Sequence, residues 1–299
     1  MDLVTRVTDT HLQTAEGSGA ARLRFLGGLW DIQSRIAAVN RPYEAPDAQA
    51  GRDALVTRQQ LFLVGTPVVS VAEYVDAAAR IARYASETAG LSAEQAEALL
   101  AVDFSAIVDE ERLAGAASCP DGFVAAIADE MAAQPGSALA PATIAFVLAS
   151  ALVPFLVGPA ARAVEVLGEI DAGVWAEGRC PVCGSAASAG RMSETTQLMG
   201  AQRTLWCGMC HTEWGIERIK CARCGSRNPD VLHYTYVEQD PAHRLHLCDE
   251  CHGYTKFVFV DDLDTPVSMV VEDAVMTTLD AAALAQGYTA TGDGGKSSC

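Results

Sequence analysis

Eight cysteines between residues 180 and 251 are the side chains of this sequence best suited to chemistry. They form four C-x-x-C pairs, and each cysteine of the first two pairs recurs 41 positions later in the last two. A C-x-x-C turn directs two thiolates at one point, and two facing turns make a tetrahedral sulfur site that suits zinc or a single iron. The predicted metal ligands are Cys180, Cys183, Cys207, Cys210, Cys221, Cys224, Cys248 and Cys251.

The repeat also predicts how the pairs combine. It assigns the first four cysteines to one metal ion and the last four to a second. The alternative joins the two middle pairs across residues 211–220 and the two outer pairs with each other. Letters beside the cysteines repeat as well, since Gly184 and Gly225 follow equivalent cysteines, as do His211 and His252. The duplication therefore favours the first arrangement.

A site closed by four sulfurs has no open coordination position. It is structural or, with iron, a one-electron centre, and it does not activate water. His211 and His252 could replace a sulfur, but each copy already has four. The rest of the chain offers no nucleophile beside a base, and acidic residues such as Glu94 and Glu97 read as a solvated helix face. We therefore predict a protein that is not an enzyme, with no catalytic residues and no cofactor-binding residues other than the eight cysteines.

Composition narrows the remaining classes of function. The 299-residue chain carries a net charge of −17, whereas a nucleic-acid-binding protein normally presents a basic face. The first residues lack the basic and apolar regions of a signal peptide, so cysteines at metal spacing predict a protein of the reducing cytoplasm. Residues 136–161 are uncharged and long enough for a membrane span. Pro154 and Pro159 interrupt them, and we expect two buried helices with a break there instead of a span.

The elements that position the cysteines fall into a helical part and a β part. Ser70 and Ser92 begin capping boxes, and apolar residues follow at helical spacing. After residue 178 alanine becomes rare and short strands are expected at 203–206, 213–219, 232–237, 245–247 and 254–260. The predicted fold is an N-terminal all-helical domain, two tandem rubredoxin-like or zinc-ribbon modules and a C-terminal helix. The expected boundaries are 1–175 for the helical domain (its first 17 residues loose), 176–217 and 218–262 for the two modules, 263–287 for the helix and 288–299 for a disordered tail.

The motifs around the cysteines resemble a known family. They read Cys-Pro-Val-Cys-Gly-Ser at 180–185, Cys-Gly-Met-Cys-His-Thr-Glu-Trp at 207–214, Cys-Ala-Arg-Cys at 221–224 and Cys-Asp-Glu-Cys-His-Gly-Tyr-Thr-Lys at 248–256. With Leu-His-Tyr at 232–234, they resemble the formate dehydrogenase accessory protein family, FdhE. The resemblance is specific from about residue 175 to residue 260, and upstream it extends only to a helical domain of similar length.

The resemblance implies a cytoplasmic protein that is needed to make active formate dehydrogenase and is not itself that enzyme. It implies binding to the molybdenum- or tungsten-containing catalytic subunit before export or final assembly. It also implies that the eight cysteines bind metal in rubredoxin-like modules, and it gives no role to other residues. We expect the catalytic subunit as partner, no nucleic acid and no membrane span; a homodimer and the choice between iron and zinc stay open. The alternative is a rubredoxin-like iron protein that transfers electrons to a partner enzyme.

Overall fold

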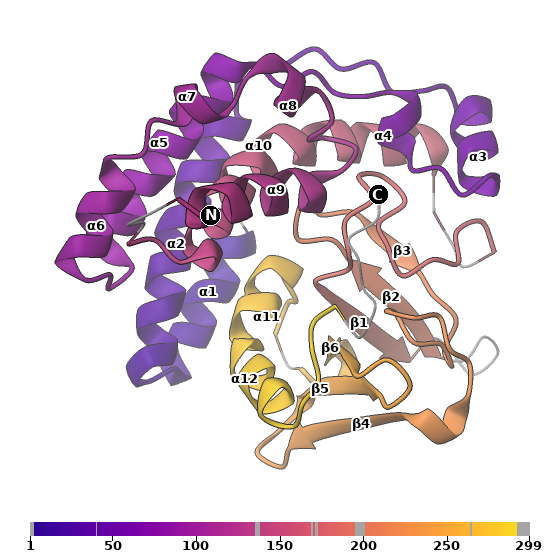
Figure 1. The fold of residues 1–299 in the computed structure, drawn as a ribbon. Coiled ribbons are helices and arrows are strands. Elements are labelled where there is room, and N and C mark those ends of the chain that lie inside the picture. Colours follow the sequence, from indigo (N-terminus) through magenta and orange to yellow (C-terminus); the bar gives the residue numbers. More distant parts are fainter. Residues whose placement is uncertain are drawn as a thin grey trace.

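A computed structural model describes residues 3–39, 41–134, 138–168, 170, 173–194, 201–263 and 265–291. Helices gather in one half of the molecule and strands in the other, with the last two helices between them (Figure 1). The longer helices are α1 (Leu3–Thr14), α2 (Gly17–Ala37), α3 (Ala48–Val56), α5 (Val71–Thr88), α6 (Ala93–Leu100), α9 (Pro120–Ala132), α10 (Pro141–Leu167) and α12 (Thr277–Ala285). The shorter ones are α4 (Leu61–Val64), α7 (Phe104–Ile107), α8 (Glu110–Ala114) and α11 (Met269–Val275). The strands are β1 (Ala189–Glu194), β2 (Ala201–Trp206), β3 (Glu213–Gly215), β4 (Leu232–Val237), β5 (Asp240–Cys248) and β6 (Gly253–Phe259).

The helical domain is organised around α10, which contacts α2, α3, α5 and α9. The predicted helix starts are confirmed. The Ser70 hydroxyl accepts a hydrogen bond from the Glu73 amide, and Ser92 forms a complete capping box with Gln95. Tyr74 of α5 is fully buried, and its hydroxyl donates to the Leu148 carbonyl of α10. The domain is thus closed by apolar packing with polar groups satisfied inside it.

The predicted break at Pro154 to Pro159 is wrong, because α10 runs without interruption through both prolines. Proline lacks the amide hydrogen that would bond the carbonyl four residues earlier, which normally costs about 3 kcal/mol in a helix interior. For Pro154 that carbonyl belongs to Ser150, and it accepts a hydrogen bond from Gln33 Nε2 of α2 at 2.8 Å. A neighbouring helix therefore supplies the missing donor, which sequence periodicity does not reveal.

Helix α10 is also the one helix in the described part of the chain that is long and apolar enough to cross a membrane. Within its most apolar window, 61% of the residues are buried inside the protein. Such burial is typical of a core helix, as the sequence predicted for this stretch.

The N-terminal residues expected to be loose form α1 instead. Val7 is buried, and α1 contacts both α2 and α11, the latter from the far end of the chain. An apolar face at helical spacing needs a partner surface to be stable, and α11 supplies it only in the folded protein. The short helices α7 and α8 were likewise not predicted.

The two cysteine modules share one sheet. Its strand order is β3-β2-β1-β6-β5-β4, and the halves are joined where β1 pairs with β6 in parallel. The expected strands at 203–206, 232–237 and 245–247 lie within β2, β4 and β5, and the one at 254–260 matches β6 except for its last residue. Strand β1 was not predicted, and β3 is shorter than expected. The two modules therefore follow one another in the sequence but form a single sheet in the structure.

The C-terminal segment packs on this sheet. Instead of one helix beginning at residues 265–266, two helices begin at Met269 and Thr277, and Gly287 follows with a φ of +87° as a helix-ending glycine. Of the predicted tail, residues 292–299 lie outside the described residues. Thr289 is bound to the second module, since its amide donates to the His252 carbonyl at 2.7 Å.

Candidate metal centres

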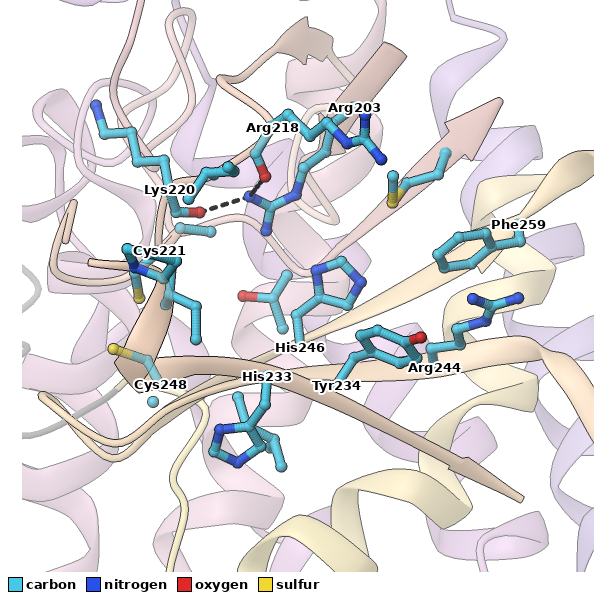
Figure 2. A pocket seen from close by; sticks show the side chains of 18 residues that line it. Arg203, Arg218, Lys220, Cys221, His233, Tyr234, Arg244, His246, Cys248 and Phe259 are labelled. Carbon is cyan, nitrogen blue, oxygen red and sulfur yellow. Dashed lines mark hydrogen bonds between the residues drawn. The ribbon is translucent and has the colours of Figure 1, made fainter. Parts of the chain in front are cut away.

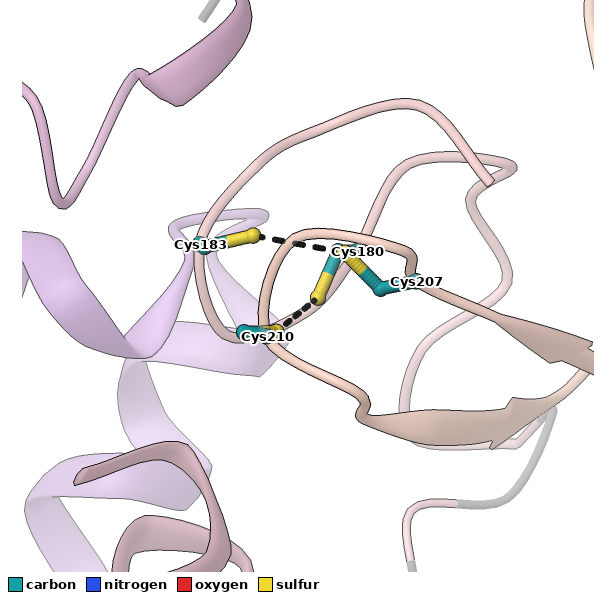
Figure 3. A group of neighbouring side chains, drawn as sticks. All are labelled: Cys180, Cys183, Cys207 and Cys210. Atoms are coloured by element: carbon teal, nitrogen blue, oxygen red, sulfur yellow. Dashed lines mark hydrogen bonds between the residues drawn. The ribbon is translucent and has the colours of Figure 1, made fainter. Parts of the chain in front are cut away.

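The structure brings the eight cysteines together as the repeat predicts. Within each set of four, all sulfur atoms lie within 4.8 Å of one another. Figure 3 shows the first set on two facing loops. The sets are Cys180, Cys183, Cys207 and Cys210, and Cys221, Cys224, Cys248 and Cys251. The alternative that joined the middle pairs is therefore excluded.

The sulfur separations fit a tetrahedral metal ion. A metal–sulfur bond of about 2.3 Å places the sulfurs of a tetrahedron about 3.8 Å apart. In the second set, the Cys221–Cys251 and Cys224–Cys248 sulfurs are each 3.8 Å apart. In the first set, the Cys180–Cys210 and Cys183–Cys207 separations are both 3.5 Å. Both sets can thus close around one ion with small adjustments of side-chain torsion.

All four turns have the same backbone form. The residue after the second cysteine has a positive φ in each: +83° at Gly184, +60° at His211, +78° at Gly225 and +49° at His252. The left-handed conformation is easy for glycine and costs about 1 kcal/mol for other residues. The two histidines therefore occupy turn positions equivalent to the two glycines, and neither belongs to the sets of four grouped sulfurs.

Polar groups point at several of the sulfurs. The Val182 amide donates to Cys180 Sγ at 3.4 Å, and the equivalent Arg223 amide donates to Cys221 Sγ at 3.3 Å. The Thr212 hydroxyl lies 3.2 Å from Cys210 Sγ. Donors of this kind stabilise negative charge on sulfur and fix the orientation of the ligands.

The first set lies inside the main core of the protein. Its four cysteines are at most 2% exposed and belong to the same apolar cluster as the helical domain. The turn between Cys180 and Cys183 is hydrogen-bonded to the start of α4, because the Leu61 and Phe62 amides donate to the Pro181 and Val182 carbonyls at 2.8 and 2.9 Å. The first centre therefore connects the sheet to the helices.

The second set lies at the edge of the molecule. Its buried cysteines form a small separate cluster with Val231 and Leu232, and Cys224 is exposed. The same sulfur chemistry thus occurs once in a dry core and once beside solvent.

Charge favours a cation in the buried set. Burial raises the pKa of the Cys180 and Cys207 thiols well above its ordinary value. Four ionised sulfurs within 4.8 Å of one another would also repel each other, so full ionisation requires a positive ion at their centre.

Several tryptophan and histidine side chains outside the two cysteine sets are buried or hydrogen-bonded within the fold. Trp206 and Trp214, which flank the Cys207–Cys210 pair, are buried. His243 is only 4% exposed. His11 Nε2 lies 3.4 Å from the Glu272 carboxylate, and the same carboxylate contacts His243 Nε2 at 3.0 Å. This His11–Glu272–His243 cluster joins positions up to 261 residues apart, so no local pattern could have predicted it.

Comparisons with known proteins agree with the cysteine motifs. The family model "FdhE, central domain" matches residues 179–218, which contain the first set of four. The FdhE homologue of Shewanella oneidensis is 36% identical over 113 residues, which cover 38% of this chain and 36% of the relative. Escherichia coli FdhE is 33% identical over 112 residues, or 36% of this chain and 34% of the relative. The aligned stretch is thus about a third of the length of these relatives.

The fold likeness extends further than the sequence likeness. The crystal structure of the FdhE protein from Pseudomonas aeruginosa superposes with a TM-score of 0.60, covering 96% of this chain and 93% of that one, at 21% identity. At this identity the match speaks to the fold. The resemblance of this chain to the formate dehydrogenase accessory protein family is therefore confirmed: the model of the FdhE central domain matches residues 179–218, and the fold is similar to that of a solved FdhE protein.

Proposed function

We propose that this protein is a non-enzymatic accessory factor that binds the catalytic subunit of formate dehydrogenase and is needed for assembly of the active enzyme. The observation that carries the proposal is the FdhE central domain, whose matched residues include all four cysteines of the first set. The whole-chain fold likeness and the sequence likeness to FdhE proteins of two other bacteria support it. A cytoplasmic location, as the resemblance implies, belongs to the same proposal.

We further propose that the eight cysteines are ligands of two metal ions, iron or zinc. The sulfur separations and the amide donors to Cys180 and Cys221 support this assignment. When bound, such an ion supplies a crosslink between distant loops. The chain itself supplies four thiolates per ion and the backbone turns that orient them.

The surroundings of the two sets suggest different duties. The first set is packed against α4 and the helical core, so its metal would hold the sheet to the helical domain. The second set has an exposed member in Cys224 and lies where a partner could reach it. We therefore infer that the first ion supports the fold and that the second supports the surface that recognises the partner.

The test is binding of the metal-loaded protein to its own organism's formate dehydrogenase catalytic subunit, measured by calorimetry and by size-exclusion chromatography with light scattering. Three samples are compared: the wild type, Cys224→Ser, and Glu165→Gln as a control substitution on the exposed face of α10. We expect tight binding by the wild type and the control and weaker binding by Cys224→Ser. Light scattering also establishes whether a monomer or a homodimer binds.

A folded, metal-loaded protein that does not bind the subunit would refute the accessory role. Equal binding by Cys224→Ser would refute the role of the second centre and place recognition on the helices. Unchanged formate dehydrogenase activity in a strain lacking this protein would count against the proposal independently. A reversible colour change on reduction, lost when zinc replaces iron together with function, would support electron transfer instead.

A further inference from the structure

A cavity of about 500 Å³ opens on the sheet beside the second cysteine set. Figure 2 shows Cys221 and Cys248 at one end and Tyr234, Arg244 and Phe259 at the other. Apolar and aromatic side chains form much of its wall, and a few polar groups converge within it. This size and this lining are typical of a site for a small organic molecule.

The charge of the cavity is opposite to that of the protein. The chain as a whole carries −17, yet four cationic residues and no acidic residue line the cavity in the described part of the chain. These cations are Arg203, Arg218, Lys220 and Arg244. Two of these cations are paired with carboxylates that do not line the cavity. Arg244 lies 3.0 Å from Asp262, and Lys220 lies 3.8 Å from Glu217. Arg203 and Arg218 have no carboxylate partner among the described residues, and the sulfurs of Cys221 and Cys248 are the anionic groups at the end of the cavity.

Arg203 is the most informative of the four. Its side chain, 6% exposed, lies over the Phe257 ring at 4.5 Å and donates to the Lys220 carbonyl. The hydrogen bonds found for its guanidinium go to backbone carbonyls, which do not neutralise its charge. Its Nε is buried and has no hydrogen-bond partner among the described residues. A buried cation with an unused donor is costly unless an anion completes it.

A second polar atom without a partner belongs to another residue of the cavity wall. His246 Nε2 is buried without a hydrogen-bond partner in the described part of the chain. In Figure 2 the side chains of Arg203 and His246 face each other across the cavity. Two unpartnered buried nitrogens, from β2 and β5, thus belong to residues of the same cavity wall, where neighbouring atoms cover both. Native proteins leave few such groups unsatisfied, and a missing ligand is an accepted cause.

We propose that this cavity binds a small organic oxyanion, a carboxylate or phosphate attached to a flat apolar body. Arg203 and Arg218 would hold the oxyanion, and the Tyr234 and Phe259 rings would contact the body. The cavity is separate from the metal ligation proposed above and does not depend on the accessory role.

The binding test uses the metal-loaded full chain at low ionic strength, where attraction between exposed charges is least screened. Phenyl phosphate and benzoate are titrated by calorimetry, with phenol and inorganic phosphate as partial probes. We expect saturable binding of the two organic anions, weaker binding of inorganic phosphate and none of phenol. Arg218 is exposed, so Arg218→Gln should fold normally and should weaken phenyl phosphate binding by roughly tenfold or more.

The matched control is Arg162→Gln, which removes the same charge from the exposed surface of α10. We expect no change in affinity for this variant. Equal weakening by both variants would show non-specific attraction and overturn the proposal. Absence of binding would show that the arginines only balance the cysteine sulfurs, and it would overturn the proposal too. Binding of an acidic peptide without binding of phenyl phosphate would reassign the cavity to protein docking.

Discussion

The His11–Glu272–His243 cluster should make stability depend on pH. Burial lowers the pKa of His243, but hydrogen bonds and charge attraction from Asp240 and Glu272 outweigh it and raise the pKa from 6.5 to about 9. The difference corresponds to roughly 3 kcal/mol of preference for the protonated ring in the folded protein. Glu272 is fully buried between α1, α11 and β5, so its charge has little access to water.

The sign follows from the two pKa values. A folded-state pKa above the unfolded value means that protonation stabilises the fold, so this contribution is complete below about pH 6.5 and is lost as the pH rises through about 9. At the acid end, burial raises the pKa of Glu272, but hydrogen bonds from His11 and His243 outweigh it and lower the pKa. The contribution of Glu272 is therefore lost as the pH falls through its lowered pKa.

The assay is urea unfolding of metal-loaded protein from about pH 6 to about pH 9, for the wild type and for Glu272→Gln. We expect the wild type to lose more stability than the variant over this range, by a part of the roughly 3 kcal/mol, because Asp240 still raises the pKa of His243 in Glu272→Gln. Comparing the two proteins cancels groups that titrate alike in both, and Glu165→Gln on exposed α10 serves as the charge control. Parallel stability curves for the wild type and Glu272→Gln would refute the reasoning.

Three further predictions concern the fold and the metal centres. Gln33→Ala should lower stability by about 1–3 kcal/mol because the buried Ser150 carbonyl loses its donor, whereas Gln286→Ala at an exposed helix end should change the melting temperature little. His252→Gly should keep full metal content and should change stability by no more than about 1 kcal/mol, because the position needs a positive φ and no ligand; loss of one metal ion would contradict this. A chelator should remove metal from the second centre before the first, since Cys224 is exposed and the first four cysteines are buried. Cys224→Ser removes a ligand from the second centre and Cys180→Ser removes one from the first, so each variant reports the metal held by its intact centre over time. Faster loss of that metal from Cys224→Ser than from Cys180→Ser would contradict the prediction.

Local features of the fold could be predicted from the sequence. The N-cap at Ser70, the capping box at Ser92, the helical N-terminal domain and the grouping of the cysteines depend on residues close in sequence or repeated at a fixed distance. The confirmed strands β4 and β6 are rich in β-branched and aromatic residues. Each of these features is set by short-range geometry that is visible in the letters themselves.

Features that depend on distant contacts could not be predicted. Strand β1 reads Ala-Gly-Arg-Met-Ser-Glu and has little β propensity, and it is fixed by pairing with β2 and β6 on either side. The continuity of α10 through Pro154 depends on Gln33, and the ordered α1 depends on α11. The anion cavity combines residues of β2, β4, β5 and β6, so its surplus of positive charge is invisible in a chain of strongly negative total charge.

The duplication in the sequence predicts two equivalent cysteine sites, but the structure gives the two sites different surroundings. Both copies have the same turn geometry, with a positive φ after each second cysteine, because the chemistry of a sulfur knuckle fixes the backbone locally. Their surroundings differ because, in the sheet that β1 and β6 join, the first copy packs into the core of the N-terminal helices, whereas the strands of the second copy pack against α11 and α12. One copy therefore became part of the core, where its sulfurs are dry and constrained by α4. The other stayed at the edge beside a cationic cavity, where exchange of metal, contact with a partner and binding of an anion are all sterically open.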